Sequence, residues 1–290
     1  WKPENYGKKF YGPSTLRKGI EYSRNLMTVR IAEKVGIKKI LELSDKLNIY
    51  KDTPELLSVS LGSSETTLLN ITSAYATFIN GGKKINPILI NRIQDRRGKT
   101  IYSSNLGECF GCDRISEKSK KFPKINNSFE KVITEETAYQ ITSILEGAVQ
   151  RGTGKKLRDL NVPLAGKTGT TNNNFDAWFI GFSSDLVIGV YIGFDSPKSL
   201  GKYETGSKAA LPIFKEFVKK AIFKDEFKPF NIPEGIFLAP INYENGKQEN
   251  FNSKKSIIEA FKLKDINKIK NNNLISNYNY DNLIKFRQFY

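Results

Sequence analysis

The chain of 290 residues contains no histidine. Within the chain, this absence excludes a catalytic centre of the Ser-His-Asp or Cys-His kind and every zinc site that needs an imidazole ligand. Proton transfer must then depend on amines, carboxylates and hydroxyl groups. We therefore expect neither a metal ion nor a cofactor, and we look for chemistry that such side chains can perform.

Cysteine is nearly as scarce, with two residues in the string Cys109-Phe110-Gly111-Cys112. One such pair cannot supply the four ligands of a structural zinc site, and no βαβ pattern of a thioredoxin surrounds it. We favour a local disulfide formed in an oxidising compartment over a pair of unused thiols.

Long apolar runs and acidic residues are also under-represented. No run approaches the ~18 residues of a membrane span. The 30 acidic and 46 basic residues leave a net charge of +16, which suits nucleic acid, an anionic membrane surface or an anionic polymer as a partner. The lysines, however, are scattered among asparagines and isoleucines without a basic motif interleaved with aromatic residues, so we expect no binding of nucleic acid.

Helical spacing of apolar residues dominates the first part of the chain. Leu16, Ile20, Met27 and Ile31 form a stripe that is interrupted at Ser23-Arg24-Asn25, which predicts two helices with a joint between them. Further helices are predicted over residues 37–47, 68–78 and 134–148, the last of them capped by the Thr134 hydroxyl.

Strand-like runs follow in two places. Residues 87–93 and 100–103 flank a turn and predict a hairpin, after which residues 104–127 form a polar, exposed excursion. Runs at 162–170, 175–182 and 186–194 are separated by short turns and predict an antiparallel meander, which a helix over residues 209–222 can cover. The predicted fold class is α+β, an antiparallel sheet covered by helices.

We expect residues 1–231 to form one domain and residues 232–290 a C-terminal extension. The extension is rich in lysine and asparagine and has no clear apolar period. We predict that it is largely flexible, with one transient helix near residues 257–263.

The string Lys167-Thr168-Gly169-Thr170 lies at the end of a strand-like run and carries the main chemical signal. An edge strand of this kind can bind an extended peptide through its main chain, and Gly169 leaves room for a ligand to lie close. The Thr168 and Thr170 hydroxyls and the Lys167 ammonium can hold a carboxylate, and a backbone N–H after Gly169 can contribute to an oxyanion hole.

Ser23-Arg24-Asn25 matches the pattern S-x-N at the predicted joint. Alone it is a weak signal, because Ser103-Ser104-Asn105 matches the same pattern. Together with Lys167-Thr168-Gly169 it resembles the S-x-x-K, S-x-N and K-T-G combination of penicillin-interacting serine enzymes, in which lysines move the protons.

The resemblance to class A penicillin-binding proteins extends from Trp1 to about residue 236, with an excursion around the cysteines that is similar to the alphaproteobacterial form. It implies the penicillin-binding transpeptidase or serine β-lactamase-like fold. The strings that carry it further are Trp1-Lys2-Pro3-Glu4-Asn5-Tyr6, Ser73-Ala74-Tyr75-Ala76-Thr77-Phe78, Arg151-Gly152-Thr153-Gly154 and Asp176-Ala177-Trp178-Phe179-Ile180-Gly181-Phe182.

The same resemblance implies roles for the matching positions. Ser23 would relay a proton between Lys167 and the leaving amine, and Asn25 would hydrogen-bond the peptide amide of the substrate. Thr168 and Thr170 would hold the terminal carboxylate, and the Thr170 N–H would complete the oxyanion hole. We interpret Asp176 and Trp178 as structural, a turn carboxylate and a core aromatic residue.

One motif of the family has no counterpart at its expected place. The nucleophile of the family lies in an S-x-x-K box before S-x-N, and residues 1–22 contain no such box. Ser128-Phe129-Glu130-Lys131 and Ser199-Leu200-Gly201-Lys202 match the string but follow Ser23, so we interpret both as chance. We therefore expect an N-terminally incomplete domain from a longer protein, and expect this chain alone to be inactive.

The expected function of the longer protein is DD-transpeptidation, in which a serine is acylated by the D-Ala-D-Ala end of a stem peptide and an amine on a second stem accepts the acyl group. β-Lactams would mimic the donor. The resemblance also implies a glycosyltransferase domain and a membrane anchor outside these residues, at the periplasmic face of the inner membrane. The alternatives are a DD-carboxypeptidase or β-lactamase-like hydrolase, and a non-catalytic module that binds peptidoglycan.

Overall fold

A three-stranded antiparallel sheet lies at the centre of the computed structural model, which describes residues 1–104, 108–110, 124–126, 129–221 and 227–265. Its strands follow the chain in the order β5 (Ala165–Thr170), β6 (Ala177–Phe182) and β7 (Val187–Ile192). The register pairs Gly169 with Trp178 and Phe179 with Val190. The predicted meander is confirmed.

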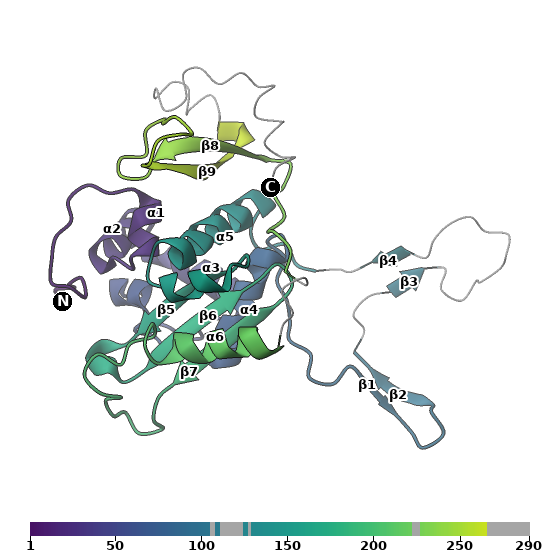
Figure 1. Cartoon of the computed structure of the whole chain (residues 1–290). Helices are drawn as coiled ribbons and strands as arrows, with labels where there is room; N and C mark the ends of the chain where they lie inside the picture. The colour runs from purple at the N-terminus through teal and green to yellow at the C-terminus, as the bar shows by residue number, and fades with distance from the viewer. Residues whose placement is uncertain (105–107, 111–123, 127–128, 222–226, 266–290) are drawn as a thin grey trace.

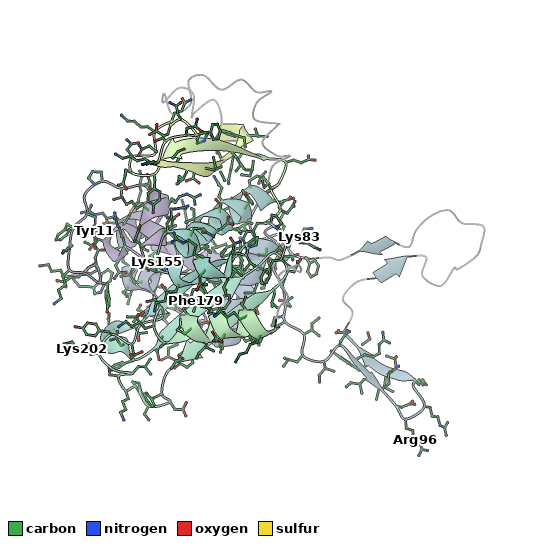
Figure 2. The ribbon with its side chains drawn as sticks, viewed as in Figure 1. Tyr11, Lys83, Arg96, Lys155, Phe179 and Lys202 are labelled. Atoms are coloured by element: carbon green, nitrogen blue, oxygen red, sulfur yellow. The ribbon has the colours of Figure 1, made fainter. Side chains whose placement is uncertain are left out.

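Helices cover both faces of this sheet (Figure 1). Helix α6 (Ala210–Ala221) packs on β6 and β7, where the buried Phe179 ring meets Phe214 edge to face at 4.9 Å. Helices α4 (Leu68–Ile79) and α5 (Glu135–Gln150) pack with Phe182 in a second apolar cluster. Because side chains alternate across a strand, Phe179 and Phe182, three residues apart in β6, point to opposite faces of the sheet. Figure 2 shows Phe179 inside the body of the molecule.

The N-terminal helices agree with the predicted helix pair. Helix α1 (Leu16–Glu21) begins after Thr15, whose side chain accepts a hydrogen bond from the Lys18 N–H. Helix α2 (Asn25–Val35) follows the predicted joint, and α3 (Ile37–Lys46) follows Gly36 at φ 92°. Thr134 caps α5 as predicted, by accepting from the Thr137 N–H. None of the helices in the described part is long and apolar enough to span a bilayer.

A hairpin of β1 (Arg92–Gln94) and β2 (Thr100–Ser103) projects from the body, with Arg96 near its tip (Figure 2). Its first strand is shorter than predicted, since residues 87–91 lie outside the ladder; Pro87 has no N–H to donate to a ladder. Strands β3 (Glu108–Phe110) and β4 (Lys124–Asn126) pair within the predicted excursion. The predicted disulfide between Cys109 and Cys112 lies outside the residues whose side chains are described.

The C-terminal extension departs from the prediction. Strands β8 (Ile236–Asn242) and β9 (Ser256–Lys262) form an antiparallel hairpin that packs on α5, where Gln140 donates to the Ala260 carbonyl at 2.9 Å. The predicted helix over residues 257–263 is wrong, because a short isolated helix is marginal while pairing with a distant strand satisfies the backbone. The prediction of a largely flexible extension is wrong for the hairpin, and residues 266–290 lie outside the described ranges. The domain boundary at residue 231 stays a prediction.

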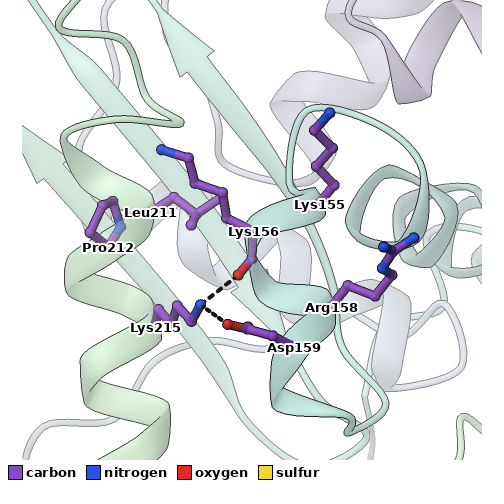
Figure 3. A pocket seen from close by; sticks show the side chains of 7 residues that line it. All are labelled: Lys155, Lys156, Arg158, Asp159, Leu211, Pro212 and Lys215. Atoms are coloured by element: carbon purple, nitrogen blue, oxygen red, sulfur yellow. Dashed lines mark hydrogen bonds and ion pairs between the residues drawn. The ribbon is translucent and has the colours of Figure 1, made fainter.

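Short 3-10 helices complete the body: η1 (Leu57–Leu61), η2 (Lys155–Leu160), η3 (Asn172–Asn174) and η5 (Leu263–Asp265). Of these, η2 matters most for the site, since it follows Thr153 and lies beside α6, whose Lys215 donates to the Lys156 carbonyl of η2 (Figure 3). It lies on the same side of the sheet as the Phe179 cluster, to which it contributes the buried Leu157 and Leu160.

Candidate functional site

Ser23 lies in the turn that separates α1 from α2. Its φ of 55° is in the left-handed region, which residues other than glycine seldom occupy. The turn is held by main-chain hydrogen bonds, from Ser23 N to Ile20 O at 3.1 Å and from Arg24 N to Gly19 O at 2.8 Å. Backbone strain of this kind is concentrated at functional sites.

Lys167 reaches Ser23 from the middle of β5. Its Nζ donates to Ser23 Oγ at 2.6 Å and to the Thr168 carbonyl at 2.8 Å, although Ser23 and Lys167 are 144 positions apart. Loss of water around the half-buried ammonium lowers the pKa of Lys167 from 10.5 to about 8. The structure therefore unites the S-x-N and K-T-G strings and gives the lysine a proton that it can release near neutral pH.

The remainder of the lysine motif lies along an edge of the sheet, because β5 pairs only with β6 among the described strands. Thr170 is exposed, and its hydroxyl accepts a hydrogen bond from the Gly206 N–H at 3.0 Å. A Cβ atom added at Gly169 would lie 3.1 Å from Trp178 Cβ, a tight contact with the neighbouring strand. Glycine has no side chain and avoids this contact. An extended peptide can approach an edge of this kind through its main chain.

Thr153 joins the site and was assigned no role from the sequence. The Thr168 hydroxyl donates to the Thr153 hydroxyl at 2.8 Å. The consecutive residues Lys167 and Thr168 thus contact Ser23 and Thr153 respectively. Thr153 lies in the string Arg151-Gly152-Thr153-Gly154, which carries part of the family resemblance. That string could have drawn attention to Thr153, but it does not reveal the partner of its hydroxyl.

Asn25 occupies the first turn of α2, beside Ser23 in the chain. Its side-chain amide donates to the Glu4 carbonyl at 2.9 Å, and the next backbone N–H, of Leu26, binds Asn5 Oδ1 at 3.2 Å. The N-terminal segment therefore contacts the residue for which the resemblance implies a bond to substrate, and that bond stays a prediction.

Of the two residues interpreted as structural, Asp176 agrees with its interpretation and Trp178 does not. The Asp176 carboxylate accepts from the Tyr191 hydroxyl at 3.0 Å at the start of β6, which agrees with a turn carboxylate. Trp178 is not a core residue: it is half-buried and its ring lies 4.5 Å from that of Tyr191. Phe179 takes the core position, because neighbouring residues of a strand point to opposite faces.

Of the two alternative S-x-x-K strings, the structure places the serine of the second, and no hydrogen bond joins it to Ser23 or Lys167 among the described residues. Ser199 is exposed in a loop and its hydroxyl donates to the Asn173 carbonyl at 2.9 Å. Ser128 lies outside the described residues. In the ranges that the structure describes, no group of three or more cysteine and carboxylate side chains is placed to hold a metal ion.

A separate basic cavity of about 570 Å³ lies between η2 and α6 (Figure 3). Lys215 Nζ donates there to Asp159 Oδ2 at 2.5 Å and to the Lys156 carbonyl at 2.7 Å. Its lining contains neither Ser23 nor Lys167 and consists of Lys155, Lys156, Arg158, Asp159, Leu211, Pro212 and Lys215. The assembled hydroxyl and lysine cluster is therefore the stronger candidate for the chemistry.

Comparison with known proteins agrees with this geometry. A family model described as the penicillin binding protein transpeptidase domain matches residues 1–219. The chain belongs to this family, as its motifs and fold predict.

Relatives of the chain include proteins named penicillin-binding protein 1A. That of Rickettsia typhi is 42% identical over 282 residues, which are 96% of this chain and 35% of the relative. That of Pseudomonas aeruginosa is 32% identical over 296 residues, 91% of this chain and 36% of the relative. The chain thus spans about a third of the length of these proteins, and the predicted similarity to the alphaproteobacterial form is confirmed by the rickettsial matches.

Solved structures show the same fold. The crystal structure of penicillin-binding protein 1A from Haemophilus influenzae is 29% identical and superposes with a TM-score of 0.77, covering 91% of this chain and 42% of that one. An imipenem acyl-enzyme complex of penicillin-binding protein A from M. tuberculosis, at 18% identity, superposes with a TM-score of 0.57 and covers 76% of this chain and 51% of that one. The predicted fold class is confirmed.

Proposed function

We propose that the protein containing this chain is a peptidoglycan DD-transpeptidase that works by serine acyl transfer. One observation carries the proposal: the Lys167 ammonium donates to Ser23 Oγ at 2.6 Å although the two residues lie 144 positions apart. A chain without histidine needs another group to move protons, and a lysine whose pKa is lowered to about 8 suits that task. Membership of the transpeptidase domain family supports the proposal.

In this mechanism a serine hydroxyl attacks the carbonyl carbon between the two D-alanines of a stem peptide. The C–N bond breaks, D-alanine leaves, and its amine takes a proton that Ser23 passes on from the Lys167 ammonium. An acceptor amine then attacks the acyl-enzyme, returns a proton through Ser23 to Lys167, and releases the serine. The hydroxyl proton of the attacking serine would pass to a base of the longer protein, proposed to be the lysine of its S-x-x-K box, and would return to the serine when it is released, so that both protons are restored after the second step.

The edge of β5 would hold the donor peptide. The Lys167 charge and the Thr168 and Thr170 hydroxyls would bind its terminal carboxylate, with Gly169 admitting the chain close to the strand. The Thr170 N–H would stabilise the oxyanion, and the Asn25 amide would bind the peptide backbone once the substrate displaces its contact with Glu4.

The acylated serine is proposed to belong to an S-x-x-K box outside these 290 residues, because residues 1–22 contain none. The longer protein is further proposed to carry a peptidoglycan glycosyltransferase domain and a membrane anchor, and to act at the periplasmic face of the inner membrane. β-Lactams would acylate the same serine. Solved neighbours that are acyl-enzyme complexes of imipenem and penicillin G support this part of the proposal.

The product of the reaction tests the proposal. The full-length protein, given a donor stem peptide and an amine-bearing acceptor stem, should form a cross-linked dimer and release D-alanine, as measured by mass spectrometry. Release of D-alanine without a dimer would support a hydrolase instead. The 290-residue chain alone serves as the control and should form neither product.

The pH dependence of acylation tests the state of Lys167. Because the protonated amine donates to Ser23, the second-order rate constant for acylation of the full-length protein by penicillin should fall as the pH rises through about 8, the pKa of the free enzyme. In Lys167→Arg the charge persists at high pH, so this alkaline decline should disappear even though the absolute rate is lower. A decline that persists unchanged in Lys167→Arg would assign it to another group.

A further inference from the structure

Glu21 is a fully buried carboxylate at the end of α1, two residues before Ser23. Arg151 donates to it twice, from Nη2 to Oε1 at 2.6 Å and from Nε to Oε2 at 3.2 Å. The Tyr243 hydroxyl donates to Oε2 at 2.6 Å. A buried charge is tolerated only with partners of this kind, so their positions are strongly constrained.

Arg151 lies at the C-terminal end of α5, two residues before Thr153. The Thr153 N–H also donates to the Glu21 carbonyl at 3.1 Å, so both the side chain and the backbone of Glu21 bind the turn that contains Thr153. The packing is tight, since a Cβ added at Gly152 would lie 2.1 Å from the Glu21 carbonyl oxygen. Glu21 therefore joins the turn of Ser23 to the turn of Thr153.

These two turns meet consecutive residues of β5. Ser23 Oγ accepts from Lys167, and Thr153 Oγ1 accepts from Thr168. A shift of either turn would lengthen one of these short hydrogen bonds, and proton transfer is sensitive to such displacements. The contact between Glu21 and Arg151 therefore joins two turns, one of which carries the Ser23 hydroxyl and the other the Thr153 hydroxyl.

The β8–β9 hairpin contributes two side chains to this network, one bound to Glu21 and one bound to Arg17. Besides Tyr243, which follows β8, it supplies Glu259 in β9. The Glu259 carboxylate accepts from Arg17 Nε at 2.5 Å and also pairs with Arg17 Nη2. Arg17 is itself buried in α1 and donates to the Ser143 carbonyl of α5 at 2.8 Å. Figure 1 shows the hairpin lying over α1 and α5, and its residues follow the segment that the transpeptidase family model matches, residues 1–219.

We propose that the β8–β9 hairpin positions the catalytic turns: through Tyr243 and Glu259 it fixes α1 and Glu21, and thereby holds Ser23 against Lys167 and Thr153 against Thr168. Tyr243 and Glu259 are positioning residues that act through Glu21 and Arg17. The expected effect on acylation rests on the proposed function. The coupling between the hairpin and Thr153 does not depend on the proposed function.

The kinetic test uses Tyr243→Phe in the full-length protein. The ring that lies 5.4 Å from the Lys18 ammonium and 5.4 Å from the Arg151 guanidinium is retained, and only the hydroxyl bound to Glu21 is lost. Acylation by a fluorescent penicillin should slow by about tenfold, as expected for the loss of a hydrogen bond to a charged group. Glu244→Gln, at the next position, is the matched control and should change the rate by less than about twofold, because the exposed Glu244 pairs with Lys18 and not with Glu21.

A background without the positioned hydroxyls separates positioning from general destabilisation. In Ser23→Ala/Thr153→Val neither turn has a hydroxyl left for the hairpin to position, so Tyr243→Phe should slow acylation by only about twofold or less. An undiminished tenfold effect in that background would overturn the proposal, as would Tyr243→Phe acylating at the parental rate. Glu259→Gln should act in the same direction as Tyr243→Phe, because it weakens the bidentate contact with Arg17.

Hydrogen exchange tests the coupling without any activity. In Tyr243→Phe and Glu259→Gln the Thr153 amide, which donates to the Glu21 carbonyl, should exchange faster than in the parent, while Glu244→Gln should leave it unchanged. If the parent takes no penicillin label, the proposed function fails, and the exchange rates still decide the structural inference. Equal exchange at Thr153 in all four proteins would overturn it.

Discussion

Lys167→Ala should slow acylation of the full-length protein by penicillin by about 10²–10³-fold, on the order of 3–4 kcal/mol in activation free energy. The substitution removes both the charge that would hold the carboxylate and the donor to Ser23 Oγ at 2.6 Å. Because the ammonium is partly desolvated, which is what lowers its pKa to about 8, water does not replace these contacts at full strength. Stopped-flow or gel-based labelling rates measure the effect.

Ser23→Ala should also slow acylation, and the Lys167→Ala/Ser23→Ala double variant should lose less than the product of the two single effects, because the two groups act as one unit. Lys198→Ala is the control: Lys198 is an exposed loop lysine over the Phe194 ring and should change the rate little. A folded Lys167→Ala protein that acylates within a factor of about three of the parent would contradict the mechanism, being well short of the expected range.

Glu21→Ala should lower the free energy of unfolding of the domain by about 3–5 kcal/mol. The substitution leaves Arg17, which is 3% exposed, with one carboxylate fewer, and it removes the acceptor of both Arg151 and Tyr243. Cations that lose their partner in the interior retain their desolvation cost, so the loss exceeds the strength of any single hydrogen bond. Urea denaturation of the full-length protein, through the shift of the transition in which this domain unfolds, measures the change.

Glu216→Ala is the comparison for this effect, since Glu216 pairs with Lys219 at 3.4 Å on the exposed side of α6. That substitution should change the stability by no more than about 1 kcal/mol, as is usual for surface ion pairs. A Glu21→Ala variant no more destabilised than Glu216→Ala would mean that the buried network does not hold α1 to α5.

The elements closest to the site were accessible from local patterns. The apolar stripe broken at Ser23-Arg24-Asn25 predicted the joint between α1 and α2, and short turns between apolar runs predicted the β5–β6–β7 meander. Both depend on interactions between residues close in the chain, which periodicity and turn composition report. The site residues Ser23 and Lys167 came from motif strings, and the structure brings these two together.

The errors have a common physical origin. Residues 257–263 have an apolar spacing that a helix also fits, and only the distant strand β8 decides that they form β9. In β6 every residue from Ala177 to Phe182 is apolar or glycine, so the two-residue period of a strand does not reveal which face is buried. The interpretation of Trp178 as a core aromatic residue is wrong for this reason, and the buried ring is that of Phe179. In both cases the packing partner lies elsewhere in the chain.

The absence of histidine and the strings S-x-N and K-T-G were enough to restrict the chemistry to lysine and hydroxyl groups and to indicate the family, because residue type and short spacing are local properties. The 2.6 Å contact of Lys167 with Ser23, the lowered pKa of that lysine, the role of Thr153 and the buried Glu21 network needed the folded chain. Each depends on which distant residues come together and on how much water they exclude, and desolvation is a property of the packed interior rather than of any segment.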